Sequence, residues 1–384
     1  MSPNDHDSSH DPVPFIDLRA QYRRLKADID AALAHVLDDG RFVLGPPVEE
    51  LEAALAARAG AAHAVTCASG TDALLIALMA EGIGPGDAVF VPGFTFPATA
   101  GVVALLGAAP VFVDVTEESC MMDPADLAAR AARVAAEGRL TPRAVIAADL
   151  FGQAADYDAL APIAVEQGML LIDDAAQSFG GISGGRPVGA LAPVTATSFY
   201  PAKPLGGYGD GGALFADDAA RASIWRSIRQ HGQGGGKYDI VRVGLNSRLD
   251  TLQAAILLVK LAAFDAEIDA RERVAALYDS VLAGVVGLPG RLPGRRSTWA
   301  QYTIRLDRRD EVQATLAAQG IPSAIHYPVP MHLQPAYSAY GAGPGSLPVS
   351  ERLSRQVLCL PMHADLDEAT TMRIAQAVRD AAAG

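Results

Sequence analysis

The first two-thirds of the chain alternates short apolar runs, rich in β-branched residues, with stretches of helical periodicity such as 72–81 and 98–106. Apolar runs of this length without polar alternation are typical of strands buried on both faces. Helices between such strands predict an α/β fold with a mostly parallel sheet covered on both sides. The seven predicted strands are residues 63–66, 88–91, 109–113, 145–148, 170–172, 196–199 and 213–216.

The last third of the chain has a different pattern. Residues 249–283 are helical and long, residues 284–297 form a loop rich in Gly, Pro and Arg, and the remainder suggests a smaller α+β unit. Polar residues without an apolar core open the chain. We therefore predict a flexible tail (1–13), a large domain (14–261) and a small C-terminal domain (262–384).

Composition supports a large core and excludes several classes of partner. Half of the 384 residues are hydrophobic and 20% are charged, which excludes general disorder. A net charge of -13 argues against nucleic-acid binding, which requires a basic surface. The most apolar stretch, 98–113, is interrupted by Gly and Pro and is shorter than the ~20 residues of a membrane span. Three scattered cysteines are typical of reduced thiols in a cytoplasmic protein.

The strongest local signal is Lys203, which lies just after the predicted strand 196–199. Glycines follow it at positions 206, 207, 209, 211 and 212, and glycine allows a backbone to turn tightly and approach a ligand closely. A partly desolvated lysine in this position can act as an amine nucleophile toward a carbonyl group. Taken alone, the segment is explained equally well as a surface loop with an exposed charge.

Two adjacent carboxylates, Asp173 and Asp174, end the buried strand 170–172. Carboxylates in such a place are costly unless a cation or a hydrogen-bond donor meets one of them. A protonated pyridine nitrogen is a suitable partner, and this pairing makes pyridoxal phosphate an electron sink. Without Lys203, a role in capping a helix N-terminus would be the favoured interpretation.

Two further strand ends carry residues suited to a planar phosphate ester. Gly70 and Thr71 join a strand to a helix, where free backbone N–H groups form a phosphate seat, although an ordinary N-cap explains the same residues. Phe96 follows the strand 88–91 and offers an aromatic face for stacking. Ligands of such sheets bind beyond the carboxyl ends of the strands, so we expect these residues to lie together.

The combination of segments resembles the nucleotide-sugar aminotransferases of the DegT type, which are fold-type I pyridoxal-phosphate enzymes. The resemblance extends from Phe15 to the C-terminus and implies a seven-stranded, mostly parallel sheet. It rests on residues 15–18, 69–73, 172–177, 198–212, 244–248 and 326–328. Within the family, residues 244–258 and 324–330 most resemble the UDP-2-acetamido-2-deoxy-3-oxo-glucuronate aminotransferases.

The resemblance also implies roles for individual residues. Lys203 would form the Schiff base with the cofactor and Asp174 would pair with its pyridine nitrogen, which makes these two the expected catalytic residues. Asn246 would reach the cofactor phosphate of the other subunit, which implies a homodimer with shared active sites. The expected cofactor-binding residues are Gly70, Thr71, Phe96, Asp174, Gln177, Ser198, Lys203 and Asn246. The expected substrate-binding residues are Arg248, His326 and Tyr327.

The implied reaction moves an amino group from glutamate or a similar donor to a keto-hexose nucleotide, with a UDP-3-keto-N-acetylglucosaminuronate as the expected acceptor, for polysaccharide biosynthesis. An aminotransferase on a neutral dTDP- or UDP-keto-6-deoxyhexose and a non-catalytic regulator with the same fold are the alternatives. A sugar dehydratase of this family would carry histidine in place of Lys203. No metal site is expected, because His326 and His332 lack partners at ligand spacing.

Overall fold

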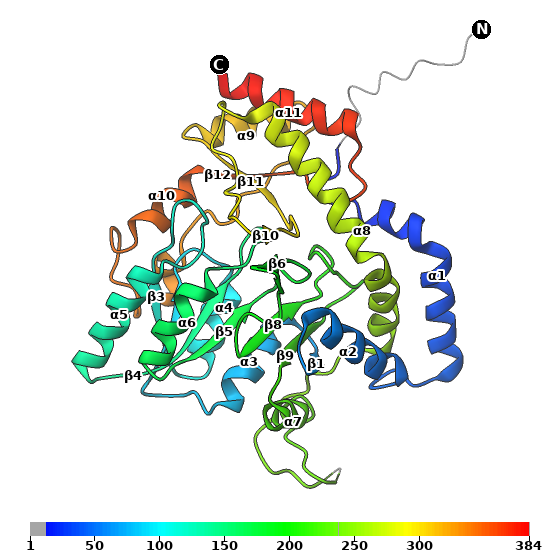
Figure 1. The fold of residues 1–384 in the computed structure, drawn as a ribbon, viewed down its shortest axis with the longest axis vertical. Helices are drawn as coiled ribbons and strands as arrows, with labels where there is room; N and C mark the ends of the chain where they lie inside the picture. The colour runs from blue at the N-terminus through cyan, green and yellow to red at the C-terminus, as the bar shows by residue number, and fades with distance from the viewer. Residues whose placement is uncertain (1–12, 237, 384) are drawn as a thin grey trace.

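The computed structural model describes residues 13–236 and 238–383, and its centre is a seven-stranded sheet (Figure 1). β9 is antiparallel to both of its neighbours, and every other pair of adjacent strands is parallel. In spatial order the strands are β1 (His63–Cys67), β9 (Gly212–Ala216), β8 (Val194–Ser198), β5 (Leu170–Asp174), β4 (Thr141–Ala148), β2 (Asp87–Pro92) and β3 (Ala109–Val113). All seven predicted strands belong to this sheet, so the predicted α/β fold is confirmed.

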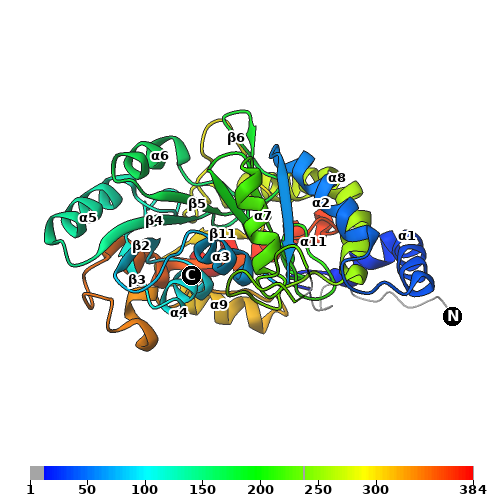
Figure 2. The same ribbon diagram turned by 90° about the horizontal axis from the view of Figure 1, so that it is seen from below.

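Helices cover both faces of the sheet (Figure 2). Successive strand residues point to opposite faces, so Phe90 packs into one core cluster and Val91 into another. The face of Phe90 is covered by α2 (Pro46–Ala59), α5 (Pro124–Glu137), α6 (Tyr157–Glu166) and the first half of α8 (Thr251–Leu282). The face of Val91 is covered by α3 (Gly70–Ala80), α4 (Pro97–Leu105) and α7 (Ala219–Ile228).

The C-terminal residues form a smaller unit above the sheet in Figure 1. Its core contains the side chains of Tyr278, Trp299 and Tyr302. Its elements are β11 (Tyr302–Arg305), paired antiparallel with β12 (Val357–Leu360), and the helices α9 (Arg309–Ala318), α10 (Pro348–Gln356) and α11 (Glu368–Ala383). Short elements complete the described chain: β6 (Ile182–Ser183), β7 (Arg186–Pro187), β10 (Arg295–Arg296) and the 3-10 helices η2 (Met331–Leu333) and η3 (Pro335–Tyr337).

The long helix α8 connects the two units, and α1 (Leu18–Asp39) packs along it. The predicted domain boundary after Leu261 falls inside α8, and the division of the chain there stays a prediction. Of the predicted tail, residues 1–12 lie outside the described residues, whereas Val13 is buried and its N–H donates to the carbonyl oxygen of Gly320 (3.3 Å). None of the helices described here combines the length and apolar character that crossing a membrane requires.

Candidate active site

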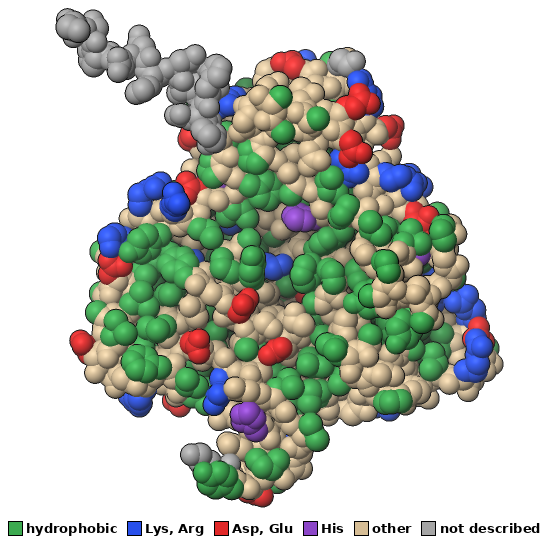
Figure 3. All heavy atoms as spheres, turned by 180° about the vertical axis from the view of Figure 1, so that it is seen from behind, with side chains coloured by type: hydrophobic (Ala, Val, Ile, Leu, Met, Phe, Trp, Pro, Cys, Tyr) green, Lys and Arg blue, Asp and Glu red, His purple; other side chains and the backbone are tan. Residues whose placement is uncertain are grey.

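A cavity of about 500 Å³ lies at the edge of the sheet where the parallel strands end. Figure 3 shows a hollow at the centre of one face of the molecule, with basic, acidic and histidine side chains in or beside it, as expected for this cavity. Nine of the predicted site residues line the cavity, and those expected at the strand ends of the sheet lie together there. They are Gly70, Thr71, Phe96, Asp174, Gln177, Ser198, Lys203, His326 and Tyr327.

Lys203 and Asp174 are opposite charges within this cavity. Asp174 is the last residue of β5, and Lys203 lies in the loop between β8 and β9. Burial lowers the pKa of Lys203, and the charge of Asp174 partly offsets that effect. Burial likewise raises the pKa of Asp174, while a hydrogen bond from Thr99 and the charge of Lys203 act in the opposite direction. A desolvated lysine of this kind has a nucleophilic amine.

The carboxylate of Asp174 is held in place from two sides. The hydroxyl of Thr99, in α4, donates to Oδ2 (3.0 Å), and the backbone N–H of Ala176 donates to Oδ1 (3.4 Å). Both donors are neutral. A cationic partner in the cavity, as a pyridinium nitrogen would be, can therefore pair with this half-buried carboxylate.

The N-terminus of α3 closes another side of the cavity. Ser69 caps the helix by accepting from the N–H of Asp72 (3.0 Å), which leaves the first N–H groups of the helix free for an anion. A Cβ on Gly70 would lie 2.6 Å from the Cβ of Ser198, and a Cβ on Gly212 would lie 2.4 Å from the carbonyl oxygen of Ser69. Only glycine permits this close packing, so the local sequence builds a narrow seat suited to a phosphate.

Aromatic and amide groups from both units form the wall beside Asp174. Tyr327 makes edge contacts with Phe94 and lies 6.2 Å from Phe96, centroid to centroid. Nε2 of Gln177 donates to the hydroxyl oxygen of Tyr327 (3.2 Å). Phe96 keeps 53% of its surface exposed, so it presents an open face toward the cavity. Burial and the charge of Lys203 lower the pKa of His326, which favours its neutral form.

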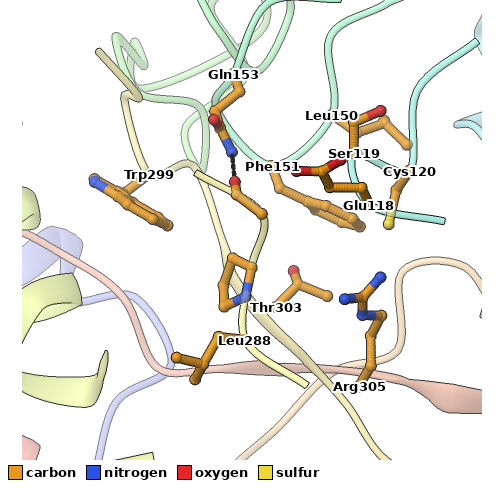
Figure 4. A pocket seen from close by; sticks show the side chains of 12 residues that line it. Glu118, Ser119, Cys120, Leu150, Phe151, Gln153, Leu288, Trp299, Thr303 and Arg305 are labelled. Atoms are coloured by element: carbon orange, nitrogen blue, oxygen red, sulfur yellow. Dashed lines mark hydrogen bonds between the residues drawn. The ribbon is translucent and has the colours of Figure 1, made fainter. Parts of the chain in front are cut away.

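A much smaller cavity, about 20 Å³, lies between the loop after β4 and the small unit (Figure 4). This volume holds about one water molecule, so it is too small for a substrate. Nε2 of Gln153 donates to the carbonyl oxygen of Gly290 beside it. The backbone N–H of Phe151, which lines the cavity, donates to Oε1 of Gln177 (2.8 Å). We conclude that this joint between the two units positions Gln177.

Asn246 and Arg248 do not line the large cavity of their own chain. Instead, Nη2 of Arg248 donates to Oδ1 of Asn246, so the two side chains lie on the same side of the segment, as the extended conformation predicts. Ser247 points the other way, is buried, and donates to the carboxylate of Asp72 (2.6 Å). The segment is thus anchored to the start of α3, with Asn246 exposed beside it.

Several residues of the cavity had not been predicted from the sequence: Thr95, Asp149, Tyr200, Asp210 and Gln301. Asp149 directly follows β4, so the same strand-end criterion that identified Asp174 also identifies it. Gln301 comes from the small unit, and no local pattern indicates its contribution.

Among the described residues, no cluster of His, Cys, Asp and Glu is arranged to hold a metal ion. Nε2 of His332 contacts Oε1 of Glu351 (3.1 Å).

The residues present fit a pyridoxal-phosphate ligand. A narrow anion seat, a desolvated amine, a buried carboxylate and an aromatic face surround one cavity, and each corresponds to one group of that cofactor. The width of the seat is set by the packing of Gly70 on Ser198, which a Cβ would disrupt.

Comparison with known proteins agrees with this geometry. The chain is 48% identical over 369 residues to the UDP-2-acetamido-2-deoxy-3-oxo-D-glucuronate aminotransferase of Pseudomonas aeruginosa, covering 95% of this chain and 99% of the relative. It is 44% identical to the dTDP-3-amino-3,4,6-trideoxy-alpha-D-glucose transaminase of Streptomyces venezuelae, covering 96% of each chain. The crystal structure of a DegT DnrJ EryC1 StrS aminotransferase from Brucella abortus superposes with a TM-score of 0.94, at 52% identity, covering 96% of this chain and 99% of that one.

A family model also matches almost the whole chain. It aligns with residues 23–379, which include both units of the fold and every residue of the cavity. The chain belongs to the DegT/DnrJ/EryC1/StrS aminotransferase family.

Proposed function

We propose that this protein is a pyridoxal-phosphate-dependent aminotransferase that transfers an amino group from glutamate to a UDP-3-keto-N-acetylglucosaminuronate. The observation that carries the proposal is the pair of half-buried groups of opposite charge, Lys203 and Asp174, in a cavity of about 500 Å³. That volume lies in the usual range for cofactor and substrate pockets.

We also propose a cytoplasmic location. The three cysteines are free and buried, which is in keeping with that location.

The site residues predicted from the sequence have distinct parts in this reaction. Pyridoxal phosphate, when bound, supplies an aldehyde that condenses with amines and a ring that withdraws electrons from the adjacent carbon. Nζ of Lys203 supplies the resident amine and, once released, moves protons at the reacting carbon. Asp174 holds a proton on the ring nitrogen, and the backbone of Gly70 and Thr71 with the hydroxyl of Ser198 binds the phosphate. Gln177 and Phe96 orient the ring.

The preferred substrate follows from Arg248 and from the relatives. A guanidinium is well suited to a carboxylate as a two-point partner, and the 48% identical relative is named for a glucuronate substrate. We therefore propose that Arg248 binds the C6 carboxylate of the sugar. His326 and Tyr327, on the side of the small unit, contact the sugar. The alternative substrate is a neutral keto-6-deoxyhexose linked to dTDP or UDP. The name of the Streptomyces venezuelae relative, which contains a dTDP sugar, supports this alternative.

We also propose a homodimer in which the segment 246–248 completes the active site of the neighbouring subunit. Asn246 is exposed and lies outside the cavity of its own chain. The nearby loop that projects at the bottom of Figure 1 carries large exposed side chains, with Val243 83% exposed and Ile240 55% exposed. Exposed apolar groups gathered on one projection are typical of an interface. A second copy of the chain would cover them.

An assay of matched sugar nucleotides tests the proposal. Purified protein is supplied with pyridoxal phosphate, glutamate and either a UDP-3-keto uronate or a dTDP-3-keto-6-deoxyhexose, and the amino sugar is identified by mass spectrometry. We expect amination of the uronate with the larger kcat/KM and release of 2-oxoglutarate. Faster amination of the neutral sugar would favour the alternative substrate. Cofactor binding without amination of any keto sugar would instead support a regulator.

A further inference from the structure

A buried polar cluster lies at the wall of the active-site cavity, and one of its members, Asp149, lines that cavity. It consists of Asp149, after β4, Tyr157, at the start of α6, and Asp173, the next-to-last residue of β5. At most 3% of the surface of any of these residues is exposed. The hydroxyl oxygen of Tyr157 lies 2.9 Å from Oδ1 of Asp149 and 2.7 Å from Oδ1 of Asp173. Both distances are those of hydrogen bonds.

A count of hydrogens shows that the two carboxyl groups cannot both be ionised. A tyrosine hydroxyl has one hydrogen to donate, and an ionised carboxylate can only accept. Tyr157 can therefore donate to one of its two carboxyl partners. At the other contact, the hydrogen must come from the carboxyl group. If both carboxyl groups were ionised, one of them would contact the hydroxyl oxygen of Tyr157 with no hydrogen between the two oxygens. In an interior without water, such a contact has a large desolvation cost.

The surrounding donors identify which carboxyl group is ionised. Besides Tyr157, Asp149 accepts from the backbone N–H of Ala155 (2.7 Å) and from the hydroxyl of Ser178 (2.6 Å). Among the residues that the structure describes, Asp173 has only the hydroxyl of Thr195, at 3.3 Å, as a further donor. Hydrogen bonds to the charged form stabilise it, so the negative charge belongs on Asp149.

Electrostatics leads to the same assignment. Burial raises the pKa of Asp149 to about 7, while the hydrogen bonds from Ser178 and Ala155 act in the opposite direction. Burial is the main cause that raises the pKa of Asp173 well above its ordinary value, and the charge of Asp149 raises it further. The titratable groups that face Asp173 are Asp149, Tyr157 and Asp174, and none of them is a cation. Lys203 acts on Asp174, not on Asp173.

We propose that Asp173 is a neutral carboxylic acid that donates to Tyr157, which in turn donates to an ionised Asp149. Asp173 is then a positioning residue. It adds no charge beside Asp174, its neighbour on β5, so that Asp174 remains the carboxylate available inside the cavity. An ionised Asp173 would repel the charge of Asp174 and weaken its hold on a ring nitrogen. This consequence rests on the proposed function, whereas the protonation of Asp173 does not.

Infrared spectroscopy of the full-length holoprotein tests the assignment directly. At pH 7.5, the difference spectrum of wild type minus Asp173→Asn should contain the C=O stretch of one protonated carboxylic acid. The matched spectrum of wild type minus Asp149→Asn should contain mainly a carboxylate band. The proposal is overturned if the first difference spectrum lacks the acid band, whether because both groups are ionised or because the proton resides on Asp149.

Thermal unfolding of the same two variants gives a second readout. An asparagine amide can donate to Tyr157 as the protonated Asp173 does, so Asp173→Asn should not lower Tm by more than about 2 °C at neutral pH. Asp149→Asn should lower Tm by at least about 4 °C, because its three donors lose a charged acceptor. The reverse order of the two variants would contradict the assignment. Neither readout requires transamination, so a wrong substrate assignment would leave both results unchanged.

The stability of wild type relative to Asp173→Asn should change with pH in one direction. The unfolded chain releases the Asp173 proton above its ordinary pKa of about 3.9, whereas the folded chain keeps it. Wild type therefore loses stability relative to Asp173→Asn as the pH rises from about 5 toward the raised pKa of the folded state. The Tm of Asp173→Asn minus that of wild type should increase steadily between about pH 5 and pH 8. A difference that does not vary with pH in this range would rule out a proton held by Asp173.

Discussion

Gly70 packs so closely on Ser198 that a Cβ at position 70 would lie 2.6 Å from the Cβ of Ser198. The first residue of α3 is thereby joined to the last residue of β8, and both belong to the expected phosphate seat. The seat depends on the absence of a side chain, which makes its contribution to cofactor binding measurable.

Gly70→Ala should weaken binding of pyridoxal phosphate by about tenfold or more, because α3 must move away from Ser198 and its N–H groups leave the phosphate. Fluorescence titration of the apoprotein with cofactor measures the change. Gly84→Ala is the matched control, since a Cβ there has its nearest neighbour, the carbonyl oxygen of Leu106, at 3.9 Å. Equal affinities for the two variants would show that the seat does not bind the phosphate.

Lys203→Ala should abolish covalent attachment of the cofactor and reduce kcat by about a thousandfold or more, because the resident amine is lost. Borohydride reduction followed by peptide mapping should locate the adduct of the wild-type protein on Lys203. Lys26→Ala, which removes an exposed lysine paired with Asp30, should behave as wild type. An adduct on any other lysine would contradict the role of Lys203.

Mixtures of Lys203→Ala and Asn246→Ala subunits should recover activity that neither variant has alone. In a mixed dimer, one of the two sites combines an intact Lys203 with an intact Asn246 from the neighbour. Random association predicts about a quarter of wild-type activity for the unfractionated mixture and about half for the isolated mixed dimers. The measurement is kcat after co-refolding, with mixed dimers isolated by two affinity tags. Isolated mixed dimers without activity would rule out the shared site.

Arg248→Lys should reduce kcat/KM for a uronate substrate far more than for a matched neutral 6-deoxy sugar. Loss of a charged, two-point contact in a desolvated site costs about 2–5 kcal/mol. A neutral sugar makes no such contact, so its kcat/KM should change by less than about tenfold. The comparison requires both substrates with both proteins. Parallel losses on the two substrates would reject the carboxylate role of Arg248.

Local patterns predicted the fold and part of the cavity, because the residues at strand ends mark both the limits of the sheet and the position of the site. Asp174 and Lys203 follow apolar runs, so a parallel sheet brings them to one edge. Thr99 was missed because it lies inside α4, where it resembles any helical residue until its hydroxyl is seen to donate to Asp174. Gln301 reaches the cavity through the packing of two distant units, which has no local signal in the sequence.

The sequence predicted where strands and helices occur better than it predicted the residues at which they begin and end. The sheet strand predicted at 145–148 begins at Thr141, because its first residues pair with β2 although they are less apolar. The predicted boundary after Leu261 illustrates a different limit, since α8 continues through it without interruption. Propensity cannot show whether one helix belongs to one unit or to two, because both halves have the same helical periodicity.

The continuous course of α8 has a consequence for how chains of this kind can change in length. The helix has 32 residues, and its rise of 1.5 Å per residue makes it about 48 Å long. Near its start, Gln253 accepts from the N–H of Tyr208 in the loop that carries Lys203, and farther along Arg271 donates to the carbonyl oxygen of Trp299. One inserted residue between these contacts would rotate the second half by about 100°. Insertions and deletions must therefore fall in the surface loops. The number of residues in α8 has to stay constant, because it sets the distance and the rotation between the loop of Lys203 and the small unit.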